Sequence, residues 1–260
     1  MFIMLTNDDG IHARGLRALY RHLLKAGHEV AVVAPLGEQS AVGHSITVLN
    51  PLRVKKIEET DFRGLAVSGT PTDCVKLGIT TLLDKRPELL VSGMNAGGNV
   101  GPDVLYSGTV AAATEAAAMN LPSLAVSHCS FQHIDLESYA QYAVEQIAQI
   151  PWKKLPERLV MNLNLPACPY AEFKGLCICP QTSVTWEDWY MQREDPRGIP
   201  YYWLKGDIPL KNVLPGTDKY ETDQGFATLT PLRFDFNDWS ALKILAKNLP
   251  QAKAFLREAP

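Results

Sequence analysis

Residues 2–34 read FIMLTNDDGIHARGLRALYRHLLKAGHEVAVVA, and this stretch predicts a β-strand, an α-helix and a second β-strand in that order. The runs 2–5 and 30–34 have the length and apolar content of buried strands. The segment between them carries apolar residues at helical spacing, namely Leu16, Leu19, Tyr20, Leu23 and Leu24. Gly27 follows where a helix commonly ends. Such an alternation is typical of parallel strands joined by helical crossovers, so we expect an α/β fold.

The same alternation continues as far as about residue 166. Short apolar runs predict further strands at 65–67, 89–91, 124–126 and 159–163. A helix is expected to begin at Thr70-Pro71, with a hydroxyl cap followed by proline. A second helix opens at Ser107 and is mostly alanine as far as Met119, and a third spans about 136–147. Because alanine lets a helix lie close to its neighbours, the alanine-rich helix is predicted to be central.

Beyond Pro166 the alternation breaks down. Aromatic residues, prolines and charges crowd 186–203, and the next strand-like run is 226–232. We interpret this region as an arm or β-hairpin extension, followed by a peripheral closing helix near 239–248. The prediction is one α/β unit over residues 1–260, with a core of about 1–166 and the arm and closing helix in about 167–260.

Composition limits the partners and the compartment. The chain has 260 residues and a net charge of -3, so it lacks the basic excess that a long nucleic acid would require. Its five cysteines are odd in number and irregularly spaced, which favours a reducing compartment. Cys177 and Cys179 are interpreted as strand residues in preference to a metal pair. The opening apolar run is too short for a signal peptide and no run approaches a membrane span, so we expect a cytoplasmic protein without a membrane partner.

Polar side chains follow the strands of this predicted sheet, where parallel sheets bind their ligands. Asp8 and Asp9 come directly after the first strand, and Gly10 permits the turn that two adjacent side chains need to converge. Two carboxylates this close repel unless a cation neutralises them. We predict one Mg²⁺ or Mn²⁺ per subunit, held by Asp8, Asp9, the Ser40 hydroxyl and the Asn95 amide. The alternative is that an aspartate only caps the following helix.

Ser107-Gly108-Thr109 has the character of a phosphate cradle. A helix start offers free N–H groups, and a glycine there lets an anion approach the main chain. The alternative is a simple helix cap. Catalysis is assigned to Asp8, Asp9, Asn95 and Ser107, and the predicted substrate contacts are Asn7, Gly43, Ser45, Ser107, Gly108 and Thr109.

These residues predict a metal-dependent phosphomonoesterase, and two alternatives stay open. One is a nucleotide-binding module without hydrolysis, which the same cradle could serve. The other is a transferase that binds a nucleotide-sugar in the α/β crevice. The sequence contains no G-x-S-x-G or G-x-x-x-x-G-K-[ST] motif. His12, His44 and His128 are isolated, and His44 is the best candidate among them because its loop borders the predicted site.

Several motifs together resemble the SurE family of survival-protein nucleotidases. The resemblance rests on Thr6-Asn7-Asp8-Asp9-Gly10-Ile11, Gln39-Ser40, Ser45-Ile46-Thr47, Ser68-Gly69-Thr70-Pro71-Thr72-Asp73-Cys74-Val75, Ser92-Gly93-Met94-Asn95 and Asp103-Val104-Leu105-Tyr106-Ser107-Gly108-Thr109-Val110. It extends to Asp195-Pro196-Arg197-Gly198, Thr217-Asp218 and Thr230-Pro231-Leu232. The motifs follow one another in order over nearly the whole chain.

The resemblance implies a Rossmann-like, three-layer core and a metal-dependent phosphatase acting on nucleoside 5′- and 3′-monophosphates, with short polyphosphate as a substrate of some members. It implies that Asp8, Asp9, Ser40 and Asn95 hold the metal and that residues 107–109 meet the phosphate. It also implies a homodimer or homotetramer whose carboxyl-terminal arm crosses to a neighbour. Ala41 and Ala111 depart from the glycine usual in the family, and alanine would add strain of about 1 kcal/mol wherever a positive φ is needed.

Overall fold

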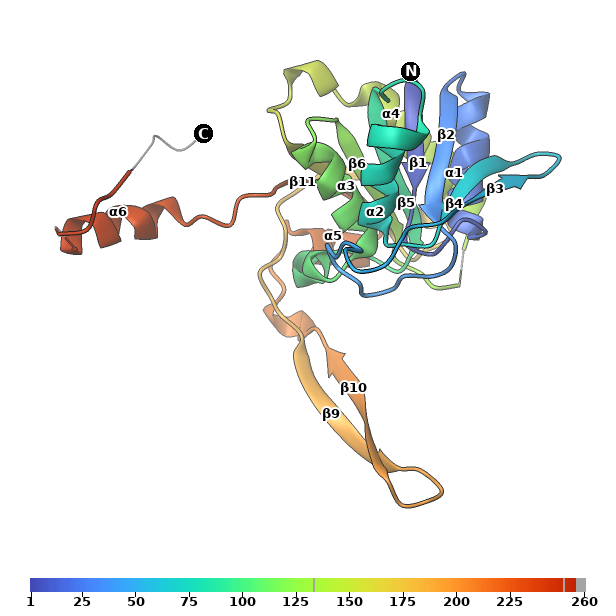
Figure 1. Ribbon diagram of the computed structural model, residues 1–260. Helices are drawn as coiled ribbons and strands as arrows, with labels where there is room; N and C mark the ends of the chain where they lie inside the picture. Colours follow the sequence, from blue (N-terminus) through green and yellow to red (C-terminus); the bar gives the residue numbers. More distant parts are fainter. Residues whose placement is uncertain (133, 250, 256–260) are drawn as a thin grey trace.

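A nine-stranded, mostly parallel sheet forms the centre of the computed structural model (Figure 1), which describes residues 1–132, 134–249 and 251–255. Its strands are β1 (Phe2–Thr6), β2 (Glu29–Pro35), β3 (Val54–Glu58), β4 (Arg63–Val67), β5 (Leu89–Ala96), β6 (Ser123–His128), β7 (Leu159–Leu165), β8 (Leu176–Ile178) and β11 (Ala227–Arg233). Their order is β3-β4-β2-β1-β5-β6-β7-β11-β8. Only the pairs β3 with β4 and β7 with β11 are antiparallel. The predicted α/β fold is therefore confirmed.

Helices cover both faces of this sheet. The helices of the described residues are α1 (Arg14–Lys25), α2 (Pro71–Leu77), α3 (Gly108–Ala118), α4 (Leu136–Gln149), α5 (Asp218–Asp223) and α6 (Trp239–Asn248), and the first four form the two covering layers. The short helical turns are η1 (Gly78–Leu82), η2 (Gly101–Leu105), η3 (Trp152–Lys154), η4 (Tyr170–Glu172) and η5 (Leu210–Asn212). Helices α1 and α4 pack together on one face, and α2 and α3 pack together on the other.

Alternation along β1 produces these two cores. Ile3 and Leu5 join the apolar cluster beneath α1 and α4, whereas Met4 joins the cluster beneath α2 and α3. Successive strand side chains point to opposite faces, so a strand that is apolar throughout must be buried on both sides. The result is the three-layer, Rossmann-like arrangement.

The alanine-rich helix α3 is central, as its composition predicts. Four of its alanines are fully or almost fully buried, namely Ala112, Ala113, Ala116 and Ala117. The helix contacts β5, β6 and β7. Small side chains allow this close approach, which fixes the amino end of α3 beside the carboxyl ends of the central strands.

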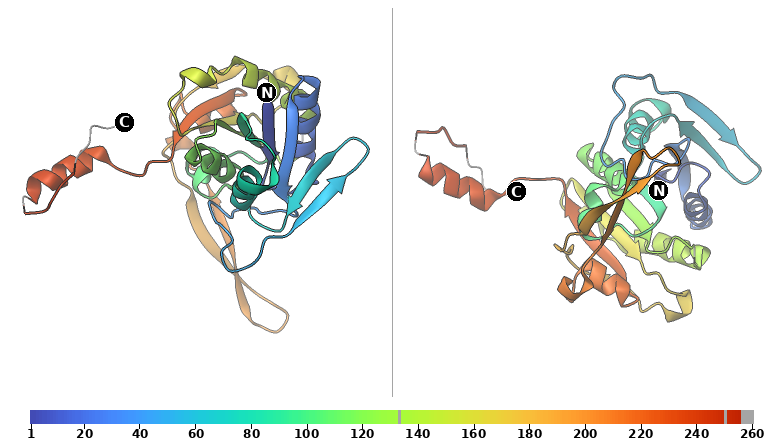
Figure 2. Two further views of the ribbon diagram at one scale, coloured as in Figure 1. Left: turned by 45° about the horizontal axis from the view of Figure 1, so that its top comes forward. Right: turned by 90° about the horizontal axis from the view of Figure 1, so that it is seen from below.

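The region beyond residue 166 contributes to the sheet as well as to an arm. Strands β8 and β11 complete one side of the main sheet, so the expected core of about 1–166 must be extended to include them. Strands β9 (Glu187–Glu194) and β10 (Pro200–Asp207) form a separate antiparallel hairpin that projects from the body (Figures 1 and 2). Helix α6 also stands away from the sheet, and none of its ten residues is buried. The expected closing helix therefore does not cover the core of its own chain.

Two further observations complete the comparison with the sequence. Cys177 pairs in register with Thr228 of β11, so its interpretation as a strand residue is confirmed, whereas Cys179 lies just beyond the end of β8. Strand β3 was not expected, because it is an exposed edge strand without an apolar run. Among the described residues, every helix is too short or too polar to cross a membrane.

Candidate functional site

Asp8 and Asp9 lie where β1 ends, and each carboxylate is held by a different neighbouring element. Asp8 is 6% exposed and accepts a hydrogen bond from the Thr109 hydroxyl of α3. Asp9 accepts a hydrogen bond from the backbone N–H of Ala96, at 3.2 Å. Gly10 turns the chain immediately afterwards with a φ of 93°. The turn that the sequence requires at this glycine is therefore present.

Asp8 is buried, Asp9 is half-buried, and the two carboxylates repel each other. Burial raises the pKa of Asp8, and the hydrogen bond from Thr109 opposes this effect. Burial, followed by the charge of Asp8, raises the pKa of Asp9 to about 6. Ionising both acids is therefore unfavourable unless positive charge lies beside them. This is the electrostatic property that a divalent cation site requires.

The segments that carry Ser40, in the loop after β2, and Asn95, near the end of β5, contact the acidic pair through neighbouring backbone groups. The backbone N–H of Gln39, next to Ser40, donates to the carbonyl of Asp8 at 2.8 Å. Asn95 directly precedes Ala96, whose N–H meets Asp9. The Ser40 hydroxyl donates to Glu38 at 2.6 Å, and the Asn95 amide donates to the carbonyl of Gly97 at 2.8 Å. Both side chains keep an oxygen lone pair for a cation in these arrangements.

Glu38 is a third acid that the sequence interpretation did not assign. Its charge raises the pKa of both Asp8 and Asp9, so it lies near enough to act on them. Its position two residues before Ser40, a predicted metal ligand, is the feature of the sequence that could have assigned it to the site. In the described part of the chain, no three His, Cys, Asp or Glu side chains form a metal-binding group. Only two of the four predicted metal ligands, Asp8 and Asp9, are of these residue types.

The cradle at residues 107–109 lies directly against Asp8. Ser107 caps α3 by accepting the N–H of Val110, which confirms the expected helix start. A Cβ added at Gly108 would lie 2.8 Å from the Cβ of Asp8 and 3.0 Å from its Oδ2. The glycine therefore permits the close contact between the acid and the helix start. Thr109 directs both its hydroxyl and its backbone N–H toward Asp8, so its contact with phosphate remains a prediction.

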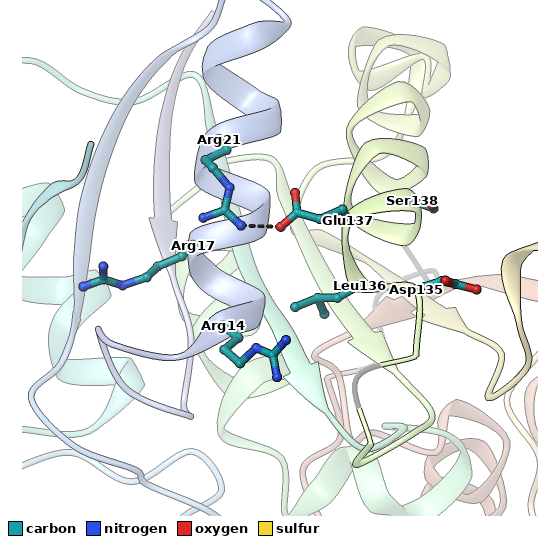
Figure 3. A pocket seen from close by; sticks show the side chains of 7 residues that line it. All are labelled: Arg14, Arg17, Arg21, Asp135, Leu136, Glu137 and Ser138. Atoms are coloured by element: carbon teal, nitrogen blue, oxygen red, sulfur yellow. Dashed lines mark hydrogen bonds and ion pairs between the residues drawn. The ribbon is translucent and has the colours of Figure 1, made fainter. Parts of the chain in front are cut away.

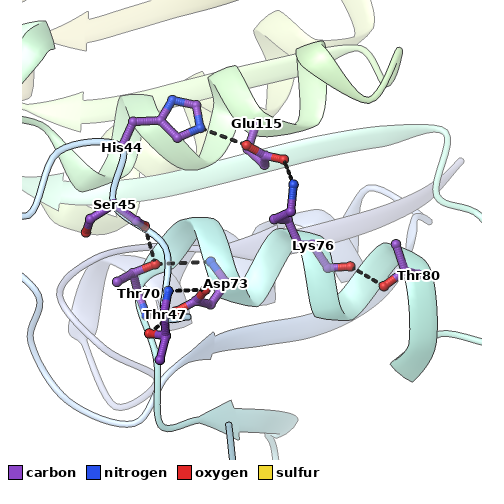
Figure 4. Close-up of polar contacts among 8 residues, drawn as sticks. All are labelled: His44, Ser45, Thr47, Thr70, Asp73, Lys76, Thr80 and Glu115. Carbon is purple, nitrogen blue, oxygen red and sulfur yellow. Dashed lines mark hydrogen bonds and ion pairs between the residues drawn. The ribbon is translucent and has the colours of Figure 1, made fainter. Parts of the chain in front are cut away.

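The loop that carries Gly43 and Ser45 is anchored on α2 and α3 (Figure 4). Gly43 has a φ of 56°, and its N–H donates to the carbonyl of Tyr106, the residue before Ser107. The carbonyl of Ser45 accepts the Thr70 hydroxyl at 2.8 Å. These contacts hold the loop beside the cradle. They support the prediction that Gly43 and Ser45 border the substrate.

Asn7 is fully buried one residue before the acids. Its amide donates to the carbonyl of Gly10 at 3.0 Å, which stabilises the turn. Its Oδ1 is buried and has no hydrogen-bond partner in the described structure. An unpaired buried acceptor is costly, so this oxygen is available to a donor near the site.

The two alanines that replace family glycines differ in backbone conformation. Ala41 has a φ of 55°, in the left-handed region, so the strain of about 1 kcal/mol expected for a positive φ applies there. Ala111 is a buried residue within the regular helix α3. Only the loop position next to Ser40 is therefore strained.

A cavity of about 510 Å³, away from the acidic pair, lies between α1 and the start of α4 (Figure 3). Three arginines line it, and two of them have acidic partners. Arg21 pairs with Glu137, which also lines the cavity, and Arg17 pairs with Glu59 at 2.6 Å. None of the predicted site residues lines this cavity. The positive charge of this cavity is largely neutralised. We therefore assign the candidate active site to the carboxyl ends of the strands.

The fold and the site together define an α/β protein of Rossmann-like architecture, with an acidic site at the carboxyl edge of its parallel sheet. Residues 3–188 match the family described as "Survival protein SurE". The chain is 59% identical over 247 residues to "5'-nucleotidase SurE" of Nitratidesulfovibrio vulgaris strain Miyazaki F, covering 95% of this chain and 92% of that protein. It is 43% identical to "5'-nucleotidase SurE" of Gloeobacter violaceus, covering 90% of each.

A solved structure agrees with these relatives. The crystal structure of the SurE protein from Aquifex aeolicus superimposes with a TM-score of 0.83 at 35% identity, covering 95% of this chain and 99% of that one. The chain belongs to the SurE family. The resemblance seen in the sequence motifs is confirmed.

Proposed function

We propose that this chain is a divalent-metal-dependent nucleotidase that hydrolyses nucleoside 5′- and 3′-monophosphates to nucleoside and phosphate. One observation carries the proposal: the start of α3 lies in contact with the Asp8 carboxylate, so a phosphoryl group at the cradle would also lie beside the acidic pair. Relatives named 5′-nucleotidase support the choice of substrate class. Short polyphosphate is a further substrate to test.

The residues present fit a divalent metal ion. Asp8 and Asp9 would hold it together with the oxygens of Ser40 and Asn95, because paired carboxylates and neutral oxygens are the ligands of Mg²⁺ and Mn²⁺. The contact distance at Gly108, where any Cβ would press on Asp8, shows how closely the acid is built into the cradle. When bound, the metal would supply a Lewis acid that polarises a phosphoryl oxygen and lowers the pKa of water.

The protein groups perform the remaining steps. Asp8 or Asp9 orients a water for in-line attack on phosphorus, and direct attack by an aspartate is the alternative route. Asn95, Ser107 and the N–H group of Gly108 stabilise the charge that gathers on the equatorial oxygens, while Thr109 holds the Asp8 carboxylate in place. The nucleoside leaves on the side opposite the attacking oxygen.

Asp8→Asn is the decisive variant. We expect a loss of phosphate release by about two to three orders of magnitude, because the variant removes a charge placed to act in the transition state. Release is measured from a panel of nucleoside monophosphates with Mg²⁺, with Mn²⁺ and with a chelator. Asp84→Asn, at an exposed acid away from the site, is the matched control. Full turnover by Asp8→Asn would defeat the assignment, and intact nucleotide bound by the wild type would favour a binding module.

We also propose a homodimer or homotetramer assembled through the carboxyl-terminal arm, with no nucleic-acid or membrane partner. Large apolar side chains are exposed before α6, on the helix and directly after it, namely Phe234, Phe236, Ile244, Leu245 and Leu249. The hairpin exposes a second set, namely Trp189, Tyr190, Tyr202, Trp203 and Leu204. Apolar surface of this kind supports a protein interface. The cytoplasmic location stays a prediction, consistent with free cysteines.

A further inference from the structure

A cavity of about 810 Å³ lies beyond the carboxyl ends of β5, β6 and β7, at the edge of the sheet that also carries the predicted phosphate site. Its walls come from the loops after these strands, from the base of the hairpin and from α5. The residues that matter here are Gly98, Asp103, Phe131, Trp186 and Lys219. None of them belongs to the metal and phosphate set. Two of the five carry aromatic rings, which distinguishes this cavity from the acidic site next to it.

The Phe131 ring packs against Gly97, two residues after Asn95. The Asn95 amide donates to the carbonyl of Gly97, and a Cβ added at Gly97 would lie 2.9 Å from the Phe131 ring. The ring therefore lies directly on the loop that follows the predicted metal ligand. Its side chain is nevertheless 80% exposed, so most of the ring surface is available for contact.

Trp186 is hydrogen-bonded to Asp103, in the segment that precedes the cradle. Its indole N–H donates to the carboxylate of Asp103, and this bond fixes the orientation of the ring. The backbone carbonyl of Asp103 accepts the N–H of Ser107 at 3.1 Å. The tryptophan therefore adjoins the cradle through one short turn, η2. The aromatic residues of the hairpin strands β9 and β10, among them Tyr201 and Trp203, do not line the cavity.

The distance from the acidic pair suits a nucleoside. Strand β5 neighbours β1, and β6 and β7 follow in order. Adjacent strands lie about 4.8 Å apart, so the cavity extends on the order of 5–15 Å from the strand end that carries Asp8. A base joined to a phosphate through one ribose falls within this range.

We infer that this cavity binds the heteroaromatic base of the nucleoside monophosphate, with Phe131 and Trp186 as its stacking surfaces. Every base has a π-face, so aromatic walls accept purines and pyrimidines alike. Asp103 offers a carboxylate acceptor at the edge of the cavity, and the ammonium of Lys219, held by Asp223 at 2.6 Å, offers a donor. The inference rests on the proposed nucleotidase function and extends it to the part of the substrate that does not react.

The test compares a substrate that has a base with one that lacks it. We measure kcat/KM for adenosine 5′-monophosphate and for ribose 5-phosphate and take their ratio. Phe131→Ala and Trp186→Ala are each expected to lower this ratio by about 5- to 100-fold, because each removes a stacking surface. Phe131→Tyr keeps the ring and should restore the ratio. Trp189→Ala, at an exposed tryptophan of the proposed hairpin interface that does not line the cavity, controls for an effect of subunit assembly and should leave the ratio unchanged.

The possible failures are distinguishable. A ratio that stays constant in both alanine variants overturns the base site, even if total activity falls. The base site is also overturned if the alanine variants change the molecular mass of the assembly in solution but leave the ratio of the two kcat/KM values unchanged. That result would show instead that the cavity receives a second copy of the chain. If the wild type hydrolyses neither ester, the proposed function fails. Calorimetry then decides the inference separately, since Phe131→Ala must weaken binding of the nucleotide more than that of ribose 5-phosphate.

Discussion

Gly10 determines where the acidic pair can lie. Its φ of 93° belongs to the region that favours glycine, and the backbone of Gly37 passes directly behind it. This close approach brings the loop after β2, with Glu38 and Ser40, beside Asp8. Gly10, which has no side chain, therefore determines how close Glu38 lies to Asp8.

Gly10→Ala is therefore expected to destabilise the fold more than an ordinary substitution at a positive φ. The conformation costs about 1 kcal/mol. The added Cβ would also lie 3.0 Å from the carbonyl carbon of Gly37, and relieving such a contact costs about 1–3 kcal/mol more. Denaturant unfolding measures the loss, and phosphate release should fall with it.

Gly27→Ala is the control for the backbone effect alone. Gly27 has a φ of 78°, and a Cβ there would meet nothing within 4 Å. We expect a loss of about 1 kcal/mol and unchanged phosphate release. Equal losses of stability in the two variants would show that the contact with Gly37 is unimportant.

At the scale of elements, a buried carboxylate joins α2, α3 and the loop after β2. Glu115 of α3 accepts from His44 at 2.8 Å and from Lys76 of α2 at 2.7 Å (Figure 4). Asp73 ties the same loop to the start of α2 by accepting from the N–H of Thr47 at 2.9 Å. These bonds fix the loop over the cradle, so the geometry of the site depends on the packing of two helices.

Glu115→Gln is expected to lower the free energy of unfolding by about 1–2 kcal/mol at pH 7, because it weakens two charge-assisted hydrogen bonds. The hydrogen bond from His44, followed by that from Lys76, lowers the pKa of Glu115 below its ordinary value of 4.5. A lowered carboxyl pKa contributes stability above the unfolded value and loses it as the pH falls through the folded value.

The difference between wild type and variant should therefore be full at pH 7 and should shrink below pH 4.5. Urea unfolding across this range measures it. Glu145→Gln, at an exposed glutamate of α4 bonded to Gln141, is the matched control and should change stability little at any pH. A difference independent of pH would contradict the role given to the Glu115 charge.

At the scale of the whole molecule, two elements project from the α/β core, namely the β9–β10 hairpin and α6. The hairpin and α6 extend from the body in different directions (Figures 1 and 2), and both expose large apolar side chains. Burying such surface is favourable by about 25 cal/mol per Å², so a second copy of the chain is the expected cover.

Leu245→Gln is expected to weaken self-association about tenfold or more, which corresponds to losing about 1.4 kcal/mol of apolar contact. Leu245 is 53% exposed on α6 and has no core of its own chain to enter. Sedimentation over a range of concentrations measures the shift toward smaller species. Lys247→Gln on the same helix is the control. A wild type that sediments as a single chain at all concentrations would refute the proposal.

The sequence by itself determined the elements and the residues at their ends. Apolar periodicity is a local property, so it predicted the strands β1, β2 and β7 and the helices that join them. Capping is local as well. Thr70 and Asp73 form the reciprocal pair of hydrogen bonds at the start of α2, and the proline follows at the first helical position.

Only the tertiary structure decided which of these ends meet. Asp8 and Thr109 are 101 residues apart in the chain, and their contact depends on the order of the strands. The same holds for Glu38 beside the acids, and for Phe131 and Trp186 around one cavity. The left-handed conformation of Ala41 was likewise set by its surroundings. No local pattern encodes such contacts, because they arise from packing between segments that are distant in sequence.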